Sequence, residues 1–596
     1  MHCGATFSNK TLRLKMKKHS FVVRVATGVA IVAMLTISVG FIRPSDTFFE
    51  VAKNIELLGK VYREIALNYV DEISVSEFMR AGIDGMLATL DPYTVFMDEE
   101  QSEDVEQLTT GKYAGIGVTI GTDRDGNVVI YSITDGYSAQ KAGMRIGDKI
   151  VKINGIDVRR KEVSDVRALI KGEPNTEVKI TVEREGERQP IEFTLIRREI
   201  QIKNVTFAGL IDDETIGYIR LERFSVNAAN EIADAIRAIE DSAKAKGKAL
   251  QGMLLDLRGN PGGLLDAAVN VASKFVEQGS IIVTTKGRDS LRIKNYTSSS
   301  PPLLKDLPLA VLINSNSASA SEIVAGAIQD LDRGIVVGTR SFGKGLVQTI
   351  TRLPYNTSLK ITTAKYYTPS GRLIQEVDYF HRNKREGKRT VFVNEPDTVH
   401  RAFKTKVGRI VYDGGGIAPD IEVPDETPSV VELALYRRST FFKFANQYQA
   451  KHPVPPKEFK ADDKLFAEFK AFLDKDNFSY DSEGERKLAE LLEIAAKYDY
   501  QDGVRKQIQE LQTAIAAEKE KELTRQKSRI LSILEREILT RYYGDSAGLQ
   551  VVLKSDRQLK AAIAVLKDQK KYKAMLAAGH QVGSAVTPRR TKSSQK

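Results

Sequence analysis

The chain has few of the residues on which most catalytic and structural sites depend. Its 596 residues include a single cysteine, Cys3, and six histidines. One cysteine excludes an intramolecular disulfide, a thiolate metal cluster and a cysteine nucleophile in the folded body. No histidine lies between Arg43 and Phe380, so that stretch holds neither a Ser-His-Asp triad nor a histidine metal site. An activated serine there needs another base, and lysine is the remaining candidate.

A net charge of +11 suggests an anionic partner, but the excess lies at the two ends of the chain. Six basic residues and no acidic ones precede residue 25, and four more basic residues fall in the last ten. The body between them is close to neutral. A nucleic-acid groove needs a clustered basic face, so nucleic acid is disfavoured as a partner.

One long uncharged run, residues 25–42, follows the basic segment 1–24. Eighteen apolar-dominated residues just reach the length needed to span a bilayer. The basic flank predicts a cytoplasmic N-terminus, a signal anchor at 25–42, and a single-pass inner-membrane protein whose larger part, after Arg43, is periplasmic. The alternative is a cleaved signal peptide, because Ser38-Val39-Gly40 resembles a cleavage site. We favour the retained anchor.

The spacing of hydrophobic residues divides the remaining sequence into distinct regions. Residues 47–110 have helical spacing, and residues 111–200 have the period of two that predicts short strands in a small, partly open barrel. Strands alternate with helices over 203–424, including a helix expected at Ala228–Ala245. This alternation predicts an α/β layer with parallel strands, interrupted by a polar insertion at 377–409. Residues 425–580 are helical and charged, and 581–596 form a basic tail expected to be disordered. The charged helices favour solvated faces, with a homo-oligomer contact as the minority interpretation.

Two segments of the α/β region could carry a nucleophile and a base. The run SASASE contains Ser319 and leads from a strand into a helix, whose N-terminus favours developing negative charge. On this segment alone, ordinary helix capping is the better account, because Ser317, Ser319 or Ser321 could each cap the helix and Ser-x-x-Glu resembles a capping box. Lys344 lies between two glycines, which is also typical of a surface turn.

A third segment, DLRGNPGG, joins a buried strand to a helix through a glycine-rich turn. A phosphate-binding turn is the natural rival, but the segment lacks both the Gly-Lys-Ser/Thr ending and the GxGxxG spacing. It does offer backbone N–H groups at a helix start, as an oxyanion hole requires.

From about Phe48 to Pro424 the chain resembles the carboxyl-terminal processing peptidases, or tail-specific proteases. The matching signatures, in the family's order, are LDPYT, YAGIGV, AGMRIGDKIVKING, DLRGNPGG, SASASEIVAGAIQD, GTRSFGKGLVQ, AKYYTPSGRLIQ and GIAPDIEVP. The resemblance implies an α/β core of the ClpP/crotonase-like kind, an inserted PDZ domain and a helical N-terminal region.

The resemblance also implies roles for individual residues. Ser319 matches the family's nucleophile, Lys344 its general base and Gln348 the glutamine that orients the lysine. Asp330 matches an acidic position implicated in some members and is taken as supporting. Positions four apart on a strand face the same side, so Gln348 is well placed to hold Lys344.

The implied oxyanion donors are the N–H of Ala320 and that of Gly262 or Gly263. Two positions depart from the family's pattern: Asn316 stands where a glycine is common, and Gly259 stands where an asparagine is frequent.

The PDZ resemblance implies a second binding site. Residues Gly115, Ile116, Gly117 and Val118 match the loop whose N–H groups receive a peptide's terminal carboxylate. The helix beginning near Val163 would form the other wall. The expected partners are therefore proteins or peptides with free, apolar C-termini.

Together these features predict a serine endopeptidase with a Ser-Lys dyad that processes or degrades extracytoplasmic proteins, without a metal or organic cofactor. One rival is a non-catalytic periplasmic scaffold that binds peptides through the PDZ domain, against which intact Ser319, Lys344 and Gln348 argue. The other is a crotonase-type enzyme acting on thioesters, which the PDZ insertion and the Ser/Lys pair disfavour.

Overall fold

The computed structural model describes residues 46–99, 101–102, 110–289, 293–379, 382–383, 386, 391, 401–456, 458–498, 502–577 and 579. The chain forms two compact units, Met1–Ala88 and Thr89–Lys596. The described part of the first unit consists of α2 (Asp46–Asn68) and α3 (Val75–Leu87). The Ser74 side chain caps α3 by accepting from the N–H of Glu77. The expected helical N-terminal region is confirmed, although 95–97 form a strand.

The expected membrane placement must be corrected. No helix in the described part of the chain is long and apolar enough to cross a membrane. The run 25–42, on which the expectation of a signal anchor depended, lies outside the described residues. A single-pass inner-membrane protein with a periplasmic catalytic part is therefore not supported.

The PDZ domain is built on an antiparallel sheet whose order is β3-β4-β5-β7-β8. Its strands are β3 (Val118–Thr122), β4 (Val128–Ile133), β5 (Lys149–Ile153), β7 (Glu177–Glu183) and β8 (Ile191–Ile196), with β6 (Ile156–Asp157) paired to β5. The alternation in β7 buries Val178, Ile180 and Val182. Helices α5 (Ser138–Lys141) and α6 (Val163–Ile170) complete the domain. Outside this sheet, β2 (Lys112–Gly115) pairs with β9 (Arg198–Gln201).

The main sheet of the second unit has six strands in the order β10-β11-β12-β15-β16-β21. They are β10 (Val205–Ile211), β11 (Ile216–Leu221), β12 (Gly252–Asp256), β15 (Leu309–Ile313), β16 (Ile335–Gly338) and β21 (Ile421–Glu422). All neighbours are parallel except β10 and β11. The carboxyl ends of β12 and β15 lead into the glycine-rich turn and the SASASE segment, so the two candidate loops meet at one edge of the sheet.

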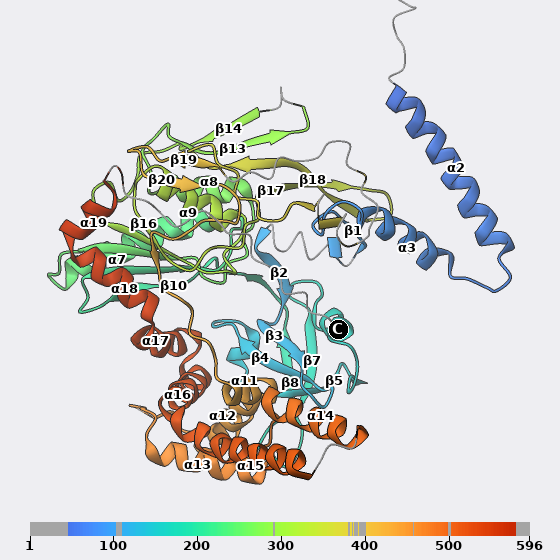
Figure 1. Ribbon diagram of the computed structural model, residues 1–596, viewed down its shortest axis with the longest axis vertical. Coiled ribbons are helices and arrows are strands. Elements are labelled where there is room, and N and C mark those ends of the chain that lie inside the picture. The colour runs from blue at the N-terminus through green and yellow to red at the C-terminus, as the bar shows by residue number, and fades with distance from the viewer. Residues whose placement is uncertain are drawn as a thin grey trace, which may run out of the picture. The chain divides into compact units, whose positions relative to one another are not determined.

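Both faces of this sheet are covered by helices (Figure 1). Met253 and Leu255 share a hydrophobic cluster with α7 (Ala228–Ala245), α8 (Leu265–Ala272) and α9 (Ala320–Asp330). Leu254, which points the other way on the same strand, clusters with α18 (Arg557–Lys567) and α19 (Gln569–Met575). Helices α18 and α19, near the end of the chain, therefore form one layer of the α/β core.

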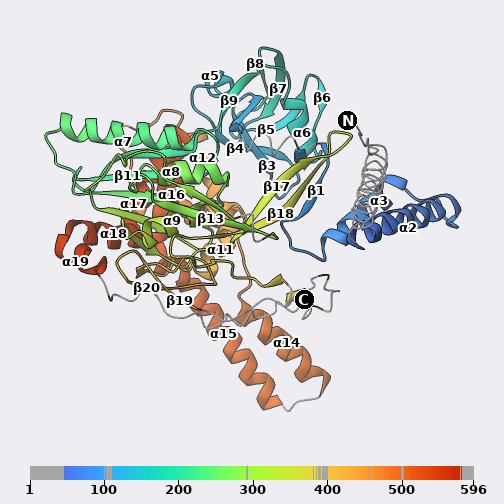
Figure 2. The same cartoon turned by 90° about the horizontal axis from the view of Figure 1, so that it is seen from above.

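A second sheet carries the Lys344 segment. Its order is β1-β18-β13-β14, and β17 pairs with β18 as a long hairpin (Figure 2). These strands are β1 (Val95–Met97), β13 (Ile281–Gly287), β14 (Ile293–Thr297), β17 (Leu346–Arg352) and β18 (Ser358–Tyr367). Most of the expected insertion at 377–409 lies outside the described residues; β19 (Ala402–Lys404) at its end pairs with β20 (Ile410–Tyr412).

Four of the remaining C-terminal helices surround an aromatic cluster that includes Phe441, Phe444 and Phe469. They are α11 (Val430–Arg437), α12 (Thr440–Lys451), α13 (Asp463–Lys475) and α16 (Lys527–Tyr543). Helices α14 (Glu483–Lys497) and α15 (Asp502–Arg525) share a separate small cluster, and α17 (Asp545–Ser555) contributes Leu553 to the cluster of α18 and α19. The Phe442 ring lies 4.9 Å from that of Tyr131 in the PDZ domain. The expected fold class, an α/β protease core with a PDZ domain and helical terminal regions, is confirmed.

Candidate active site

Ser319 lies at the N-terminus of α9, just after the loop that leaves β15. Its backbone has φ 55° and ψ −112°, a region that costs a non-glycine residue about 1–3 kcal/mol and persists only where its surroundings impose it. Ser317 Oγ donates to the Leu257 carbonyl at 2.8 Å, and Ser321 Oγ donates to the Asn260 carbonyl at 2.9 Å. Two of the three serines therefore fasten the loop to the glycine-rich turn, while the partly exposed Ser319 lines a cavity.

The glycine-rich turn packs directly against Ser319. A Cβ at Gly262 would lie 2.8 Å from the Ala318 oxygen and 3.0 Å from the Ser319 Cβ, so only glycine fits there. The Gly262 N–H donates to Asn260 Oδ1 at 2.8 Å. The N–H groups of Gly263 and Ala320 have no acceptor among the described residues. Of the two alternatives that the sequence left open, Gly263 is thus the donor that remains available beside Ala320.

Lys344 precedes β17, and its two flanking glycines allow close packing. A Cβ at Gly343 would lie 2.6 Å from that of Glu376, and one at Gly345 would lie 2.9 Å from the Gln375 nitrogen. Burial lowers the pKa of Lys344 to about 8; the charge of Lys360 adds to this effect, whereas Asp91 and Glu322 oppose it.

The Lys344 side chain rests on an aromatic ring. Its Nζ lies 4.4 Å from the centroid of the Tyr93 ring, a distance at which a cation is attracted to the ring face. Within the described residues this Nζ makes no hydrogen bond, so its contact with Ser319 Oγ is not formed in this structure. Catalytic hydrogen bonds are often long without substrate and shorten when it binds.

One buried carboxylate, that of Glu322 in α9, joins the serine loop to the lysine loop. Its Oε2 accepts from the N–H of Ser319 at 2.8 Å and from that of Lys344 at 2.9 Å. Its Oε1 accepts from the Gly343 N–H at 2.7 Å and from Ser341 Oγ at 2.6 Å. Burial raises the pKa of Glu322 to about 7, although these four donors oppose the rise. The capping interaction expected from the Ser-x-x-Glu pattern therefore also fixes the backbone of Lys344.

Among the described residues, no hydrogen bond or ion pair joins Gln348 or Asp330 to Lys344 or Ser319. Gln348 lines the same cavity, but its Nε2 donates to Thr362 Oγ1 at 3.2 Å. Asp330 ends α9, at the opposite end from Ser319, and its Oδ1 lies 2.8 Å from Nη2 of the buried Arg372. This position favours a structural ion pair for Asp330.

A single cavity of about 840 Å³ brings the candidate residues together. Those that line it are Ser319, Ala320, Gly262, Gly263, Lys344 and Gln348. The arrangement offers a hydroxyl at a helix N-terminus, an amine with a lowered pKa and two free N–H donors, as acyl transfer requires. In the described part of the chain, no group of three or more His, Cys, Asp or Glu side chains could hold a metal ion.

The PDZ domain has a smaller pocket, of about 200 Å³, between β3 and α6. Gly115, Ile116 and Val118 line it, together with Ile170 of α6. Gly117 and Val163 do not line it. Gly117 has φ 85°, and a Cβ there would lie 2.6 Å from that of Tyr137, so its role in the loop is conformational.

Two residues of the site escaped the sequence-based assignment of roles. Glu322 was visible as part of a capping pattern, but its contacts with the lysine loop depend on tertiary packing. Tyr93 belongs to the LDPYT signature, which carries no visible chemistry by itself. The resemblance marked the segment, and only the structure places its ring under Lys344.

A PDZ domain joined to an α/β core with a serine and a lysine in one cavity defines a class, the PDZ-containing serine-type peptidases. Models of known families match four consecutive parts of the chain: an activating protease N-terminal domain (42–101), a PDZ domain (129–184), peptidase family S41 (215–379) and a PDZ-protease C-terminal helical domain (431–566).

Individual relatives extend this match. A carboxy-terminal-processing protease of Bartonella bacilliformis is 37% identical over 325 residues, covering 54% of this chain and 73% of that protein. A probable CtpA-like serine protease of Staphylococcus aureus is 31% identical over 373 residues, covering 62% of this chain and 72% of that protein. The solved photosystem II D1 C-terminal processing protease is 27% identical, with a TM-score of 0.33, covering 62% of this chain and 92% of that one. The chain belongs to the carboxy-terminal-processing proteases of peptidase family S41.

Proposed function

We propose that this serine-type peptidase cleaves proteins within or near their C-terminal tails, with Ser319 as nucleophile and Lys344 as general base. The observation that carries the proposal is the shared cavity, in which Glu322 binds the backbone of both residues and burial lowers the pKa of Lys344 to about 8. About one such amine in ten is neutral at pH 7, compared with about one in 2,500 for a free lysine.

In the proposed reaction, neutral Lys344 takes the hydroxyl proton while Ser319 Oγ attacks the scissile carbonyl. The N–H groups of Ala320 and Gly263 donate to the oxyanion of the tetrahedral intermediate. The lysine then gives its proton to the departing amine, which leaves an acyl-enzyme. Water, activated by the same lysine, releases the acid product and restores Ser319.

Recognition of C-terminal tails is the finer part of the proposal. The pocket between β3 and α6 supports it, because a peptide that adds a strand beside β3 would bring its terminal carboxylate to the loop at Gly115–Val118. Its apolar wall, which includes Ile120 and Ile170, favours apolar terminal side chains. The rival function, a scaffold that binds tails without cutting them, predicts the same binding without hydrolysis.

The test compares the full chain with three variants on an unfolded protein that carries an apolar tail. Ser319→Ala, Lys344→Arg and the double variant should each lower kcat by about 1,000-fold or more, and to the same residual rate, because members of one catalytic unit are not additive. Arginine keeps the positive charge but cannot act as a base. Lys365→Arg on the exposed side of β18 is the matched control. Substantial turnover by Lys344→Arg would refute the dyad.

A further inference from the structure

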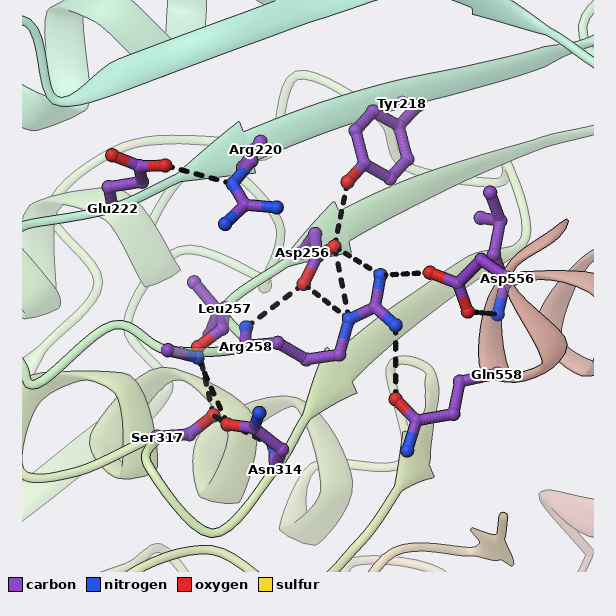
Figure 3. A network of polar contacts seen from close by, with 12 residues as sticks. Tyr218, Arg220, Glu222, Asp256, Leu257, Arg258, Asn314, Ser317, Asp556 and Gln558 are labelled. Carbon is purple, nitrogen blue, oxygen red and sulfur yellow. Dashed lines mark hydrogen bonds and ion pairs between the residues drawn. The ribbon is translucent and has the colours of Figure 1, made fainter. Parts of the chain in front are cut away.

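The turn that carries the proposed oxyanion donor is held by the C-terminal helices. Arg258, in the DLRGNPGG segment, contacts three residues through its guanidinium group: Asp256, Asp556 and Gln558 (Figure 3). Its Nη2 lies 2.6 Å from Oδ2 of Asp256 and also 2.6 Å from Oδ2 of Asp556. Its Nη1 donates to Gln558 Oε1 at 3.0 Å. Asp556 and Gln558 belong to α18 and its N-cap, about 300 residues further along the chain.

Both partners from α18 are themselves fixed. The other carboxylate oxygen of Asp556 accepts from the Leu559 N–H at 2.9 Å and so caps the helix. Gln558 Nε2 donates to the Val423 carbonyl at 2.8 Å and to Asp425 Oδ1 at 2.9 Å. Behind them, the helix packs on the main sheet through Leu559 and Ala562. The guanidinium group of Arg258 is therefore bound to a rigid support.

The contacts of Arg258 with α18 are linked by further hydrogen bonds to the backbone of the glycine-rich turn. The buried Asp256 accepts from the Arg258 N–H at 2.9 Å, and the following residue, Gly259, donates to Asn314 Oδ1 at 3.0 Å. Burial alone would raise the pKa of Asp256, but Arg258 lowers it below its ordinary value, so the pair is charged. Arg258 thus connects the support in α18 to the strand end from which the turn starts.

We propose that Asp556 and Gln558 are positioning residues for the oxyanion hole, so that the C-terminal helical domain is a working part of the peptidase site. They touch no substrate and act through Arg258 on the place of the Gly263 N–H. This inference rests on the proposed function, in which Gly263 and Ala320 bind the oxyanion. Displacement of such a donor by a fraction of an ångström affects the transition state more than the bound substrate.

The test uses Asp556→Asn in the full chain. Asparagine caps a helix about as well as aspartate, so α18 should keep its start while Arg258 loses one anionic partner. We expect kcat to fall about tenfold with KM within about twofold, and a peptide boronate that mimics the tetrahedral intermediate to bind about tenfold more weakly. Asp556→Glu, which restores the charge, should recover most of the rate. Gln558→Ala should lower kcat by about threefold.

The matched control is Asp568→Asn, which replaces the aspartate that caps the neighbouring helix α19. It should leave kcat and boronate affinity unchanged. Equal kinetic losses in the two asparagine variants, or a loss in Asp556→Asn confined to the melting temperature and KM, would overturn the positioning role.

Hydrogen exchange separates this inference from the proposed function. Peptides covering residues 257–264 should exchange faster in Asp556→Asn than in the wild type or the control, whether or not the chain is an active peptidase. Faster exchange in Asp556→Asn, combined with no Ser319-dependent cleavage by the wild type, would refute the proposed function and keep the positioning role of Asp556. Unchanged exchange of this segment in Asp556→Asn would refute the positioning role itself.

Discussion

The charge of Lys360 should set the pH at which the peptidase becomes active. Lys360 lines the same cavity as Lys344 and is the second cause, after burial, of the lowered pKa of Lys344. Lys360→Met keeps most of the side-chain length and removes the charge. The protonated form of Lys344 then loses a repulsive neighbour, so its pKa should rise. Asp91 acts in the opposite direction, and Asp91→Asn should lower the same pKa.

The size of the shift follows from the coupling between two partly buried charges. For two charges about 8 Å apart at an effective dielectric constant of about 40, this coupling is about 1 kcal/mol. Since one pKa unit corresponds to about 1.4 kcal/mol, Lys360→Met should raise the pKa of Lys344 by about 0.7 unit. At pH 7 the neutral fraction, and with it kcat/KM, should fall about fivefold, while the rate above pH 10 should change little.

The assay is the pH profile of kcat/KM on a tailed peptide, because this ratio reports the ionisation of the free enzyme. The acidic limb should have its midpoint near pH 8 in the wild type, higher in Lys360→Met and lower in Asp91→Asn. Lys365→Met, on the same strand but outside the cavity, should reproduce the wild-type profile. Shifts of Lys360→Met and Asp91→Asn in the same direction would refute the assignment of this limb to Lys344.

Two further predictions concern Glu322 and the PDZ pocket. Glu322→Gln places an NH₂ group against donors that now bind a carboxylate. This change should lower the free energy of unfolding by about 1–3 kcal/mol and lower kcat at least tenfold. The control is Glu432→Gln in α11, at another buried glutamate, which should lower the melting temperature and leave kcat intact. In the Ser319→Ala chain, a tail peptide with a free carboxylate should bind at least about tenfold more tightly than its C-terminal amide. Equal binding of the two peptides by calorimetry would exclude carboxylate capture.

Much of the fold could be predicted because its signals are local. The helix expected at Ala228–Ala245 matches α7 at both ends, since its buried residues recur at helical spacing. The strand before the glycine-rich turn was expected to be buried, and all five residues of β12 are buried, as in a parallel strand covered on both faces. Gly259, which stands where asparagine is frequent in the family, has φ 74°, a conformation that asparagine tolerates better than most residues.

The parts that sequence could not predict depend on contacts between distant segments. Nothing near Arg258 indicates that its partners are Asp556 and Gln558, because ion pairs leave no periodic pattern. The charged C-terminal helices favoured solvated faces, yet α18 covers one face of the main sheet. Similarly, Gln348 lies on the strand face expected to hold Lys344, but in this structure Thr362 accepts its amide hydrogen.

Burying Glu322 lowers the stability of the protein, but it fixes the serine loop and the lysine loop together. The charge of a buried carboxylate is costly, and the raised pKa of Glu322 means that the native state binds a proton more readily than the unfolded chain does. From about pH 4.5 to pH 7, therefore, stability from this group falls as pH rises. An apolar side chain would avoid the burial of a charge, but it would leave the N–H groups of Ser319 and Lys344 without this acceptor. The bond to the Ser319 N–H helps to hold Ser319 in its strained conformation, and the bond to the Lys344 N–H fixes the lysine loop beside it. The carboxylate therefore maintains the spacing of the proposed nucleophile and base at the expense of stability.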